Sequence, residues 1–209
     1  MTESISLTGN LPQDILSPLA GAAAGEREDS DAQLIIASKH NCEAYATLYR
    51  RYANSVYRYM LVCVVDEQDA QDLTAQTFLA GLEGVQAYQG RGTFAAWIFS
   101  IARRKVMDFY RHSQPHIPFD ELIQVPHPEQ QPDQIVEERC DYERLTRAIR
   151  TLAPDRAEAI RLRIFAELSV NEIGEAMGRN ESAVRMLLSR ALHDLRLRLN
   201  STSPSFTAR

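Results

Sequence analysis

Apolar side chains recur at helical spacing in two blocks of this sequence, and a proline-rich stretch separates the blocks. In the first block the spacing predicts a helix from about residue 30 and further helices over about 42–65, 67–86 and 94–111. In the second block it predicts helices over about 135–152, 154–165, 170–177 and 181–199. The pattern therefore predicts an all-α chain with two small helical domains.

Residues suited to the ends of helices stand where these segments begin and stop. Ser169 and Glu172 have the spacing of a capping box, and Gly178 is the expected stop of the short helix that follows. This glycine turn and the next helix are typical of a helix-turn-helix unit. The other expected end residues are Ser30 or Asp31 for the first helix, Thr93 for the helix over 94–111, Pro154 in the first turn of its helix, and Asn180 for the last helix.

Segment 66–112 is expected to form a hairpin of two amphipathic helices, joined by the loop Tyr88-Gln89-Gly90-Arg91-Gly92. The apolar stripe of the first helix consists of Ala70, Leu73, Phe78, Leu79, Leu82 and Val85. The stripe of the second consists of Trp97, Ile98, Ile101, Ala102, Met107 and Phe109. Acidic side chains gather on the first helix and basic ones at the end of the second, so the hairpin offers an acidic and a basic face.

The distribution of charge matters more than its total. A net charge of −5 at pH 7 does not favour nucleic-acid binding by itself. However, four basic side chains and one acid lie between 103 and 111, and five arginines and two acids lie between 179 and 198. The acid is concentrated elsewhere, notably over 120–143. This segregation leaves two basic stretches that are suited to phosphate contact.

The composition also excludes several classes of protein. No run approaches the roughly 18 apolar residues of a membrane span, and the N-terminus lacks the pattern of a signal peptide. The three widely spaced cysteines argue against a disulfide framework, and neither they nor the five histidines have metal-ligand spacing. Since no catalytic constellation is visible either, we expect a cytoplasmic protein that is not an enzyme and has no cofactor, metal or small-molecule substrate.

These observations divide the chain into five parts. Residues 1–28 are expected to be a flexible extension, and 200–209 a disordered tail. The two domains are expected over 29–112 and 135–199. Between them, residues 113–134 contain five prolines and several acids, which predicts a flexible linker.

The two blocks resemble the extracytoplasmic-function (ECF, group 4) sigma factors, which are promoter-recognition subunits of bacterial RNA polymerase in the sigma-70 family. The resemblance to region 2 is carried by LYRRYANSVYRYML over 48–61, by Asp69-Ala70-x-Asp72-Leu73 with Phe78, and by Gly92-x-Phe94-x-x-Trp97-Ile98-x-x-Ile101-Ala102-Arg103. The resemblance to region 4 is carried by LSVNEIGEAMGRNESAVRMLLSRALHDLR over 168–196. It implies a region 2 domain of four helices and a region 4 helix-turn-helix domain.

The resemblance implies partners and contact residues in region 2. Core RNA polymerase, through the coiled coil of its β′ subunit and through its β subunit, is expected to meet Asp69, Asp72, Leu73, Gln76 and Phe78. The non-template strand of the promoter −10 element, with one base flipped out, is expected to meet Tyr88, Gln89, Arg91, Phe94, Arg103, Arg104, Lys105 and Arg111. From the residues alone, Phe94 and Trp97 are also explained as core, and Trp97 is the better core candidate.

In region 4 the resemblance places the start of the last helix in the major groove of the −35 element. The implied contact residues are Glu181, Ser182, Arg185, Met186, Ser189 and Arg190, while Leu187, Leu188, Leu192 and Leu195 are expected to pack inward. The family often has basic residues where this chain has Leu187 and Leu192. That departure suggests fewer phosphate contacts.

Some alternatives stay open at the level of sequence. The chain could be a conventional helix-turn-helix regulator, or an adaptor that has kept the architecture and lost DNA contact. An anti-sigma protein is a further implied partner. The linker is expected either to thread through the polymerase, as in relatives, or to serve as a solvated tether. Thr74 or Thr77 is a hypothetical phosphorylation site that would restore acid to the first helix of the hairpin.

Overall fold

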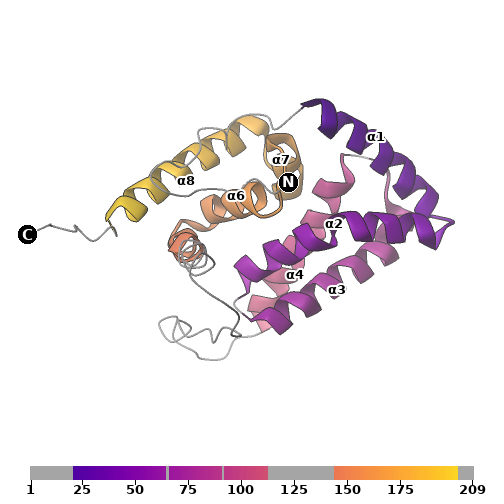
Figure 1. The fold of residues 1–209 in the computed structure, drawn as a ribbon, viewed down its shortest axis with the longest axis horizontal. Helices are drawn as coiled ribbons and strands as arrows, with labels where there is room; N and C mark the ends of the chain where they lie inside the picture. Colours follow the sequence, from indigo (N-terminus) through magenta and orange to yellow (C-terminus); the bar gives the residue numbers. More distant parts are fainter. Residues whose placement is uncertain (1–20, 65, 91, 113–143, 202–209) are drawn as a thin grey trace, which may run out of the picture.

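The computed structural model describes residues 21–64, 66–90, 92–112 and 144–201, and every regular element in these ranges is a helix. The helices form two groups (Figure 1), which confirms the predicted class of two small helical domains. The first group contains α1 (Gly21–Ser38), α2 (Cys42–Cys63), α3 (Glu67–Gly84) with a short 3-10 turn (Val85–Ala87), and α4 (Phe94–His112). The second contains a helical stretch over 144–150 followed by α6 (Pro154–Ile164), α7 (Val170–Met177) and α8 (Glu181–Ser201). The expected linker, residues 1–20 of the expected extension, and residues 202–209 of the tail lie outside the described residues.

Helix α1 begins earlier than the sequence pattern predicted. It starts at Gly21, so the expected caps Ser30 and Asp31 lie inside the helix. The segment after Gly21 is rich in alanine, the residue with the highest helix propensity, which extends the helix toward the N-terminus. Asp31 is buried, and its carboxylate accepts hydrogen bonds from Arg51 and Tyr52 of α2. Burial raises the pKa of Asp31, although both partners favour the charged form.

Two tyrosines of α2 are buried in the core between α2 and its neighbours. Tyr59 is fully buried and meets Phe99 of α4 edge to face, with 5.6 Å between the ring centroids. Tyr45 is also buried, and its hydroxyl donates a hydrogen bond to the carbonyl oxygen of Phe78 in α3. Both tyrosines lie on the side of α2 that faces α3 and α4. Tyr49, by contrast, is about half exposed, and its ring meets Phe78 of α3 edge to face.

Three predicted core residues of the hairpin lie at the surface instead. Leu79 is 57% exposed, and Leu82 and Met107 are also exposed. The predicted stripe on α3 was too wide, because α2 and α4 cover only one side of this helix. Phe78 faces that covered side, whereas Leu79, which is rotated by about 100° around the helix, faces outward.

The helix-turn-helix in the second group has the predicted local structure. Ser169 and Glu172 form both hydrogen bonds of the capping box at the start of α7. Gly178 ends α7 in the left-handed conformation, at a φ of 65°, which favours glycine. Asn180 caps α8 by accepting a hydrogen bond from the backbone N–H of Ala183. Pro154 stands in the first turn of α6, as predicted.

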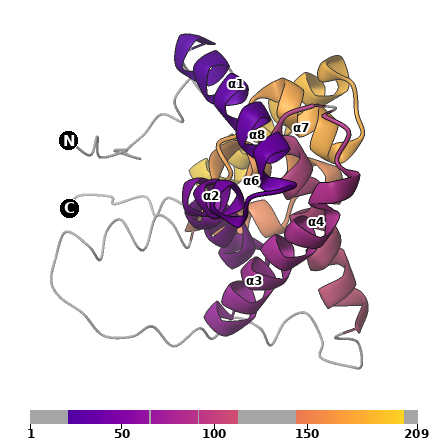
Figure 2. The same cartoon turned by 90° about the vertical axis from the view of Figure 1, so that its right-hand side faces the viewer.

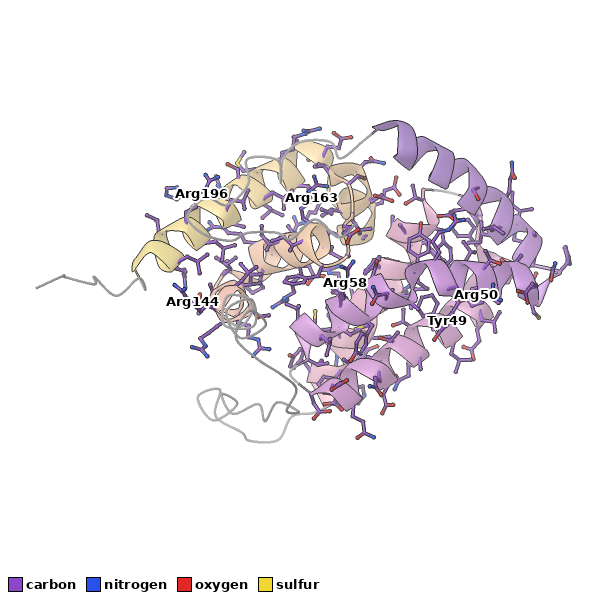
Figure 3. The ribbon with its side chains drawn as sticks, in the orientation of Figure 1. Tyr49, Arg50, Arg58, Arg144, Arg163 and Arg196 are labelled. Carbon is purple, nitrogen blue, oxygen red and sulfur yellow. The ribbon has the colours of Figure 1, made fainter. Side chains whose placement is uncertain are left out.

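The two groups of helices also pack against each other, which the sequence pattern did not predict. Helix α7 lies beside α4, and α6 approaches α2 (Figures 1 and 2). Arg58 of α2 lies between the groups (Figure 3) and forms a 2.6 Å ion pair with Glu167. The buried apolar side chains of both groups belong to one continuous cluster. In the described part of the chain, the second group of helices thus rests on the first.

Candidate polymerase and nucleic-acid interfaces

The outer face of α3 combines carboxylates with an exposed apolar side chain. Asp69, Asp72, Gln76 and Leu79 follow one another at intervals of three or four residues, so they share one side of the helix. Partial burial raises the pKa of Asp69, and the neighbouring carboxylates of Asp66 and Asp72 raise it further. This side of the helix therefore has a negative electrostatic potential, and a cationic partner would reduce the repulsion among its carboxylates. We call these four residues the α3 face.

Two predicted polymerase contacts lie beneath the α3 face rather than on it. Leu73 and Phe78 are buried, so they support the helix and do not present their side chains to a partner. The hydroxyls of Thr74 and Thr77 are buried as well, and each donates a 2.7 Å hydrogen bond to a backbone carbonyl of α3. A kinase could reach neither hydroxyl, so the phosphorylation hypothesis is wrong for the folded chain.

The loop between α3 and α4 is held by its aromatic residue. The hydroxyl of Tyr88 donates a 2.8 Å hydrogen bond to the carbonyl oxygen of Gly92, and its ring packs on Trp97 with 5.1 Å between centroids. Gly92 has a φ of 72°, which glycine adopts without strain. Thr93 caps α4 as predicted, since its hydroxyl accepts a hydrogen bond from the N–H of Ala96. Of the other predicted loop residues, Gln89 is exposed, and Arg91 lies outside the described residues.

Phe94 belongs to the core and not to the surface of the loop. Its side chain is 2% exposed and packs against the rings of Tyr52 and Trp97. The sequence left its role open between base contact and core, and the structure places it in the core. As the first residue of α4, it anchors the loop from below.

An open groove of about 430 Å³ lies between the end of α3 and the middle of α4. Tyr88 and Trp97 line one part of it, and Arg104, Lys105 and Asp108 line another. Aromatic faces beside cationic side chains are the combination that holds unpaired nucleotides. Tyr88, Arg104 and Lys105 were predicted contacts, whereas the sequence favoured a core position for Trp97. The half-buried position of Trp97 depends on its contact with the Tyr88 ring and on Gly84 at the end of α3, which the helical pattern does not reveal.

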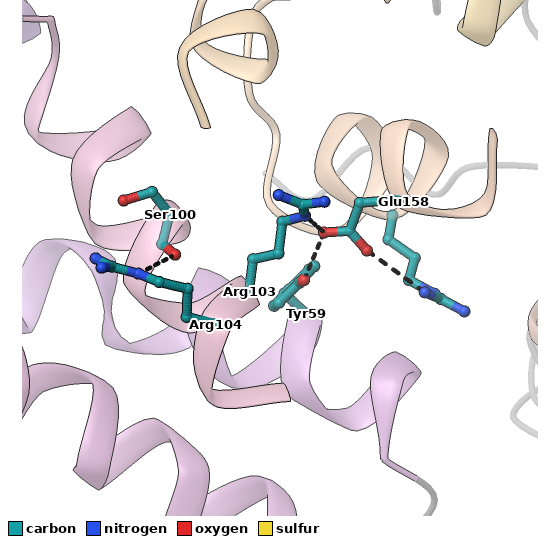
Figure 4. Close-up of polar contacts among 6 residues, drawn as sticks. Tyr59, Ser100, Arg103, Arg104 and Glu158 are labelled. Atoms are coloured by element: carbon teal, nitrogen blue, oxygen red, sulfur yellow. Dashed lines mark hydrogen bonds and ion pairs between the residues drawn. The ribbon is translucent and has the colours of Figure 1, made fainter. Parts of the chain in front are cut away.

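The four basic residues at the end of α4 do not form one cluster. Arg103 and Arg104 point to different sides of the helix (Figure 4). Arg104 donates to the backbone oxygen of Ser100 and faces the groove, whereas Arg103 faces Glu158 of α6, with 3.7 Å between Nε and Oε1. Arg111 is exposed and forms a 2.9 Å ion pair with Asp108. Only Arg104 and Lys105 therefore line the groove.

Helix α8 presents all of its predicted DNA contacts outward. Leu188, Leu192 and Leu195 are buried against α6 and α7, and Leu187 is partly buried, as predicted. The opposite side is exposed and carries Glu181, Ser182, Arg185, Met186, Ser189 and Arg190. Arg185 is held by a 3.1 Å ion pair with Glu181 one turn earlier. A helix with this exposed N-terminal half, following a tight turn, has the geometry of a recognition helix.

No helix in the described ranges has the length and apolar character needed to cross a membrane. Within the same ranges, no group of three or more His, Cys, Asp or Glu side chains is placed to hold a metal ion. The candidate sites in these ranges are the acidic face on α3, the groove beside α4 and the exposed N-terminal half of α8. They lie on a two-domain helical protein whose second domain contains a helix-turn-helix.

Comparison with known families identifies the class further. A family model described as Sigma-70 region 2 matches residues 48–115, and one described as Sigma-70, region 4 matches residues 142–195. Together the two models match more than half of the chain. The chain therefore belongs to the sigma-70 family, in its ECF branch.

Relatives and solved structures agree with this assignment. The chain is 36% identical over 157 residues to the ECF RNA polymerase sigma factor BldN of Streptomyces coelicolor, a match covering 73% of this chain and 59% of that protein. It is 28% identical over 162 residues to the RNA polymerase sigma factor YlaC of Bacillus subtilis, covering 76% and 92%. Its fold is similar to that of CnrH, solved in complex with the cytosolic domain of CnrY, with a TM-score of 0.67, 22% identity and coverage of 84% and 100%. The chain thus spans less than two thirds of BldN and nearly all of YlaC.

Proposed function

We propose that this chain is an ECF-type sigma factor that binds core RNA polymerase, recognises the −35 and −10 promoter elements and initiates transcription by capturing the non-template strand. The proposal rests on the family and, for the residues, on one observation. The α3–α4 hairpin carries an acidic face for a protein and, beside it, a groove with aromatic and cationic side chains for an unpaired strand. A conventional helix-turn-helix regulator has no need of such a hairpin.

The roles of the two domains follow from their surfaces. The carboxylates of the α3 face are suited to arginines of the polymerase β′ coiled coil, and Leu79 adds apolar area to that contact. Arg104 and Lys105 hold the backbone of the non-template strand, while the half-buried Trp97 offers a face on which an unpaired base stacks. Tyr88 is buried and supports the Trp97 ring from below. The exposed half of α8 reads the −35 element in the major groove.

The remaining parts of the proposal follow from this role. The chain itself carries out no catalysis, since bond formation belongs to the polymerase. It acts in the cytoplasm, where polymerase and promoters are found. An anti-sigma protein is the proposed regulator, and the α3 face is one surface that such an inhibitor would have to block.

The proposal is tested by transcription in vitro with purified core polymerase and a promoter selected from genomic sites bound by the chain. The wild type is expected to direct initiation at a defined start. Replacing Asp72 by Arg is expected to weaken polymerase binding roughly tenfold, because it reverses charge on the α3 face. The double change Arg104→Ala and Lys105→Ala is expected to leave polymerase binding intact and to lower promoter opening roughly tenfold.

A matched control is Arg50→Ala, which removes an exposed arginine of α2 that pairs with Glu43 on its own helix. It is expected to behave like the wild type in both assays. Two outcomes would contradict the proposal. A chain that binds duplex DNA by itself and never supports initiation with core polymerase would be a conventional regulator. A chain that binds polymerase but no promoter would be an adaptor.

A further inference from the structure

The last helix presents one apolar side chain among the polar ones of its exposed N-terminal half. Met186 is 52% exposed, and within residues 181–191, all of which the structure describes, it is the only large apolar side chain at the surface. Its neighbours three or four residues away on the same side of α8 are Ser182, Ser189 and Arg190. The side that is proposed to meet the −35 element thus has an apolar centre with a polar surround.

Met186 lies directly opposite the buried side of α8. Leu195 is fully buried and follows nine residues later, which is about two and a half turns of an α-helix. The two side chains therefore leave the helix in opposite directions. Val184 and Leu188, which are also fully buried, lie within about 20° of that direction. Of the exposed residues in this half, Met186 points most directly away from the rest of its domain.

The polar residues around Met186 occupy the flanks or are already engaged. Arg185 and Arg190 are rotated from Met186 by about 100° and about 40°, in opposite senses. The hydroxyl of Ser182 donates a 2.9 Å hydrogen bond to Oδ1 of Asn180, within the cap of the helix. An arginine is long enough to reach a phosphate or a base from the flank, whereas a residue at the centre of a helix in the major groove faces the base edges. Met186 is therefore placed opposite a base edge.

The chemistry of this side chain suits one base better than the other three. Met186 carries no hydrogen-bond donor, and its thioether sulfur is a weak acceptor. In the major groove every base presents hydrogen-bonding groups, but only thymine adds an apolar group, its 5-methyl, which apolar side chains contact. The unbranched thioether chain can adapt its shape to such a contact. Against another base, Met186 would remove a polar edge from water without offering a hydrogen bond in return.

From this placement we propose that Met186 is a specificity-determining residue of the −35 contact, and that it selects thymine at one position through the 5-methyl group. The inference rests on the proposed function, because it requires α8 to lie in the major groove of the −35 element. It adds the identity of one base, since the −35 element of this chain's promoters must then contain a thymine opposite Met186. That thymine is read by an apolar contact and not by the flanking arginines.

The test uses the full chain with core polymerase and a promoter from which the wild type initiates. Each thymine of the −35 element, on either strand, is replaced in turn by deoxyuridine, which lacks the 5-methyl group and keeps every hydrogen-bonding group of thymine. Fluorescence anisotropy measures promoter affinity for the wild type, Met186→Ala and Met186→Leu. The matched control is Leu197→Ala, which removes another exposed apolar side chain of α8, from its C-terminal half. Because both side chains are exposed, neither change is expected to disturb the fold.

In the wild type, deoxyuridine at one position is expected to weaken binding roughly fourfold, the loss that corresponds to one methyl group withdrawn from an apolar contact. Met186→Ala is expected to bind the thymine promoter less tightly and to respond to that deoxyuridine by less than about 1.5-fold, whereas Met186→Leu and Leu197→Ala keep the response of the wild type. The proposal is overturned if no thymine of the −35 element responds in the wild type, if Met186→Ala responds as the wild type does, or if Leu197→Ala loses the response as well.

Initiation by the wild type separates this inference from the proposed function. A wild type that initiates with core polymerase but is indifferent to every deoxyuridine refutes the role of Met186 alone. A wild type that never initiates with core polymerase refutes the proposed function, and the role of Met186 with it.

Discussion

The hydroxyl of Tyr45 lies 2.5 Å from the carbonyl oxygen of Phe78, and this hydrogen bond ties α2 to α3. The same hydroxyl oxygen lies 2.6 Å from the place where a Cβ on Gly81 would stand. Because the tyrosine ring is buried and held by its hydrogen bond, it cannot move aside at small cost. The close approach of the two helices therefore depends on the absence of a side chain at position 81.

Replacing Gly81 by Ala is expected to destabilise the chain by about 1–3 kcal/mol through overpacking. Alanine also has a higher helix propensity than glycine, which stabilises the helix by about 1 kcal/mol. This gain offsets only part of the expected overpacking cost. Urea unfolding followed by circular dichroism measures the difference. In a Tyr45→Phe background the clashing oxygen is gone, so the same change is expected to cost much less. An equal cost in both backgrounds would show that the contact is not the cause.

The turn of the helix-turn-helix depends on a second glycine. The N–H of Arg179 donates a 2.8 Å hydrogen bond to the carbonyl oxygen of Gly174, and a Cβ on Gly174 would lie 2.7 Å from the carbonyl oxygen of Arg179. That neighbour is backbone, which cannot rotate away. Gly174→Ala is therefore expected to cost about 1–3 kcal/mol and to weaken −35 binding by tilting α8.

The control for this prediction is Gly178→Asn in the same turn. Nothing lies within 4 Å of a Cβ at Gly178, and asparagine tolerates a positive φ better than most residues. Its expected cost is below about 1 kcal/mol, with −35 affinity nearly unchanged. Duplex binding by gel shift with polymerase present, together with urea unfolding, measures both effects. If the two variants behaved alike, the close approach of the Arg179 carbonyl oxygen to Gly174 would not be what makes Gly174 necessary for stability and −35 binding.

Local signals predicted most of this fold because they depend on neighbours in sequence. The capping box of Ser169 and Glu172, the stop at Gly178 and the cap at Thr93 each act over a few residues, and all are confirmed. The predicted start of α1 was wrong, because the alanine-rich segment after Gly21 extends the helix N-terminal to Ser30. Here, helix propensity outweighed a good capping residue.

The errors in the candidate sites came from contacts between distant parts of the chain. Leu79 and Phe78 are adjacent and equally apolar, so only the positions of α2 and α4 decide which is buried. Arg103 and Arg104 are likewise adjacent and equally basic, but one meets Glu158 and the other the groove. No periodic pattern carries this information, because it depends on how the helices pack against one another.

The two ends of the exposed side of α8 are expected to contribute differently to promoter recognition. Arg185 and Arg196 are both exposed arginines of this helix, but only Arg185 lies in the N-terminal half that is proposed to enter the major groove. Arg185→Ala is expected to cost about 1–3 kcal/mol and to relax specificity at one −35 position. Arg196→Ala is the matched control and is expected to leave the sequence preference unchanged. Measuring initiation on a set of −35 point variants tests this, and a preference unaltered by Arg185→Ala would refute the docking.

The two cysteines in the described ranges are expected to differ strongly in reactivity. Cys42 is exposed at the start of α2, whereas Cys63 is buried at its end. Burial raises the pKa of the Cys63 thiol to about 12, so the reactive thiolate is scarce. Iodoacetamide at neutral pH is expected to modify Cys42 at least about a hundredfold faster than Cys63, as followed by peptide mass spectrometry. In urea the two rates should converge, and rapid labelling of Cys63 in the folded chain would contradict its burial.

Alkaline pH is expected to lower the stability of the folded chain, because the fold buries the protonated Cys63 thiol and Tyr59 hydroxyl. Burial raises the pKa of Cys63 to about 12 and raises the pKa of Tyr59 well above its ordinary value. In the unfolded chain these groups titrate near about pH 8.5 and about pH 10. Between the unfolded and folded pKa, the folded state holds more protons, so the free energy of unfolding falls as pH rises. The contribution is fully present below about pH 8.5 and is lost toward the folded pKa.

Urea unfolding at about pH 7.5 and about pH 10.5 is expected to differ by about 2–4 kcal/mol, with Cys63 contributing the larger share. Cys63→Ala removes the titrating thiol, so its stability should depend less on pH even though its stability at neutral pH is lower. The comparison therefore uses the change between the two pH values within each protein. An equally large loss in Cys63→Ala would assign the effect to the buried tyrosines. No loss in the wild type would mean that neither group is held protonated by the fold.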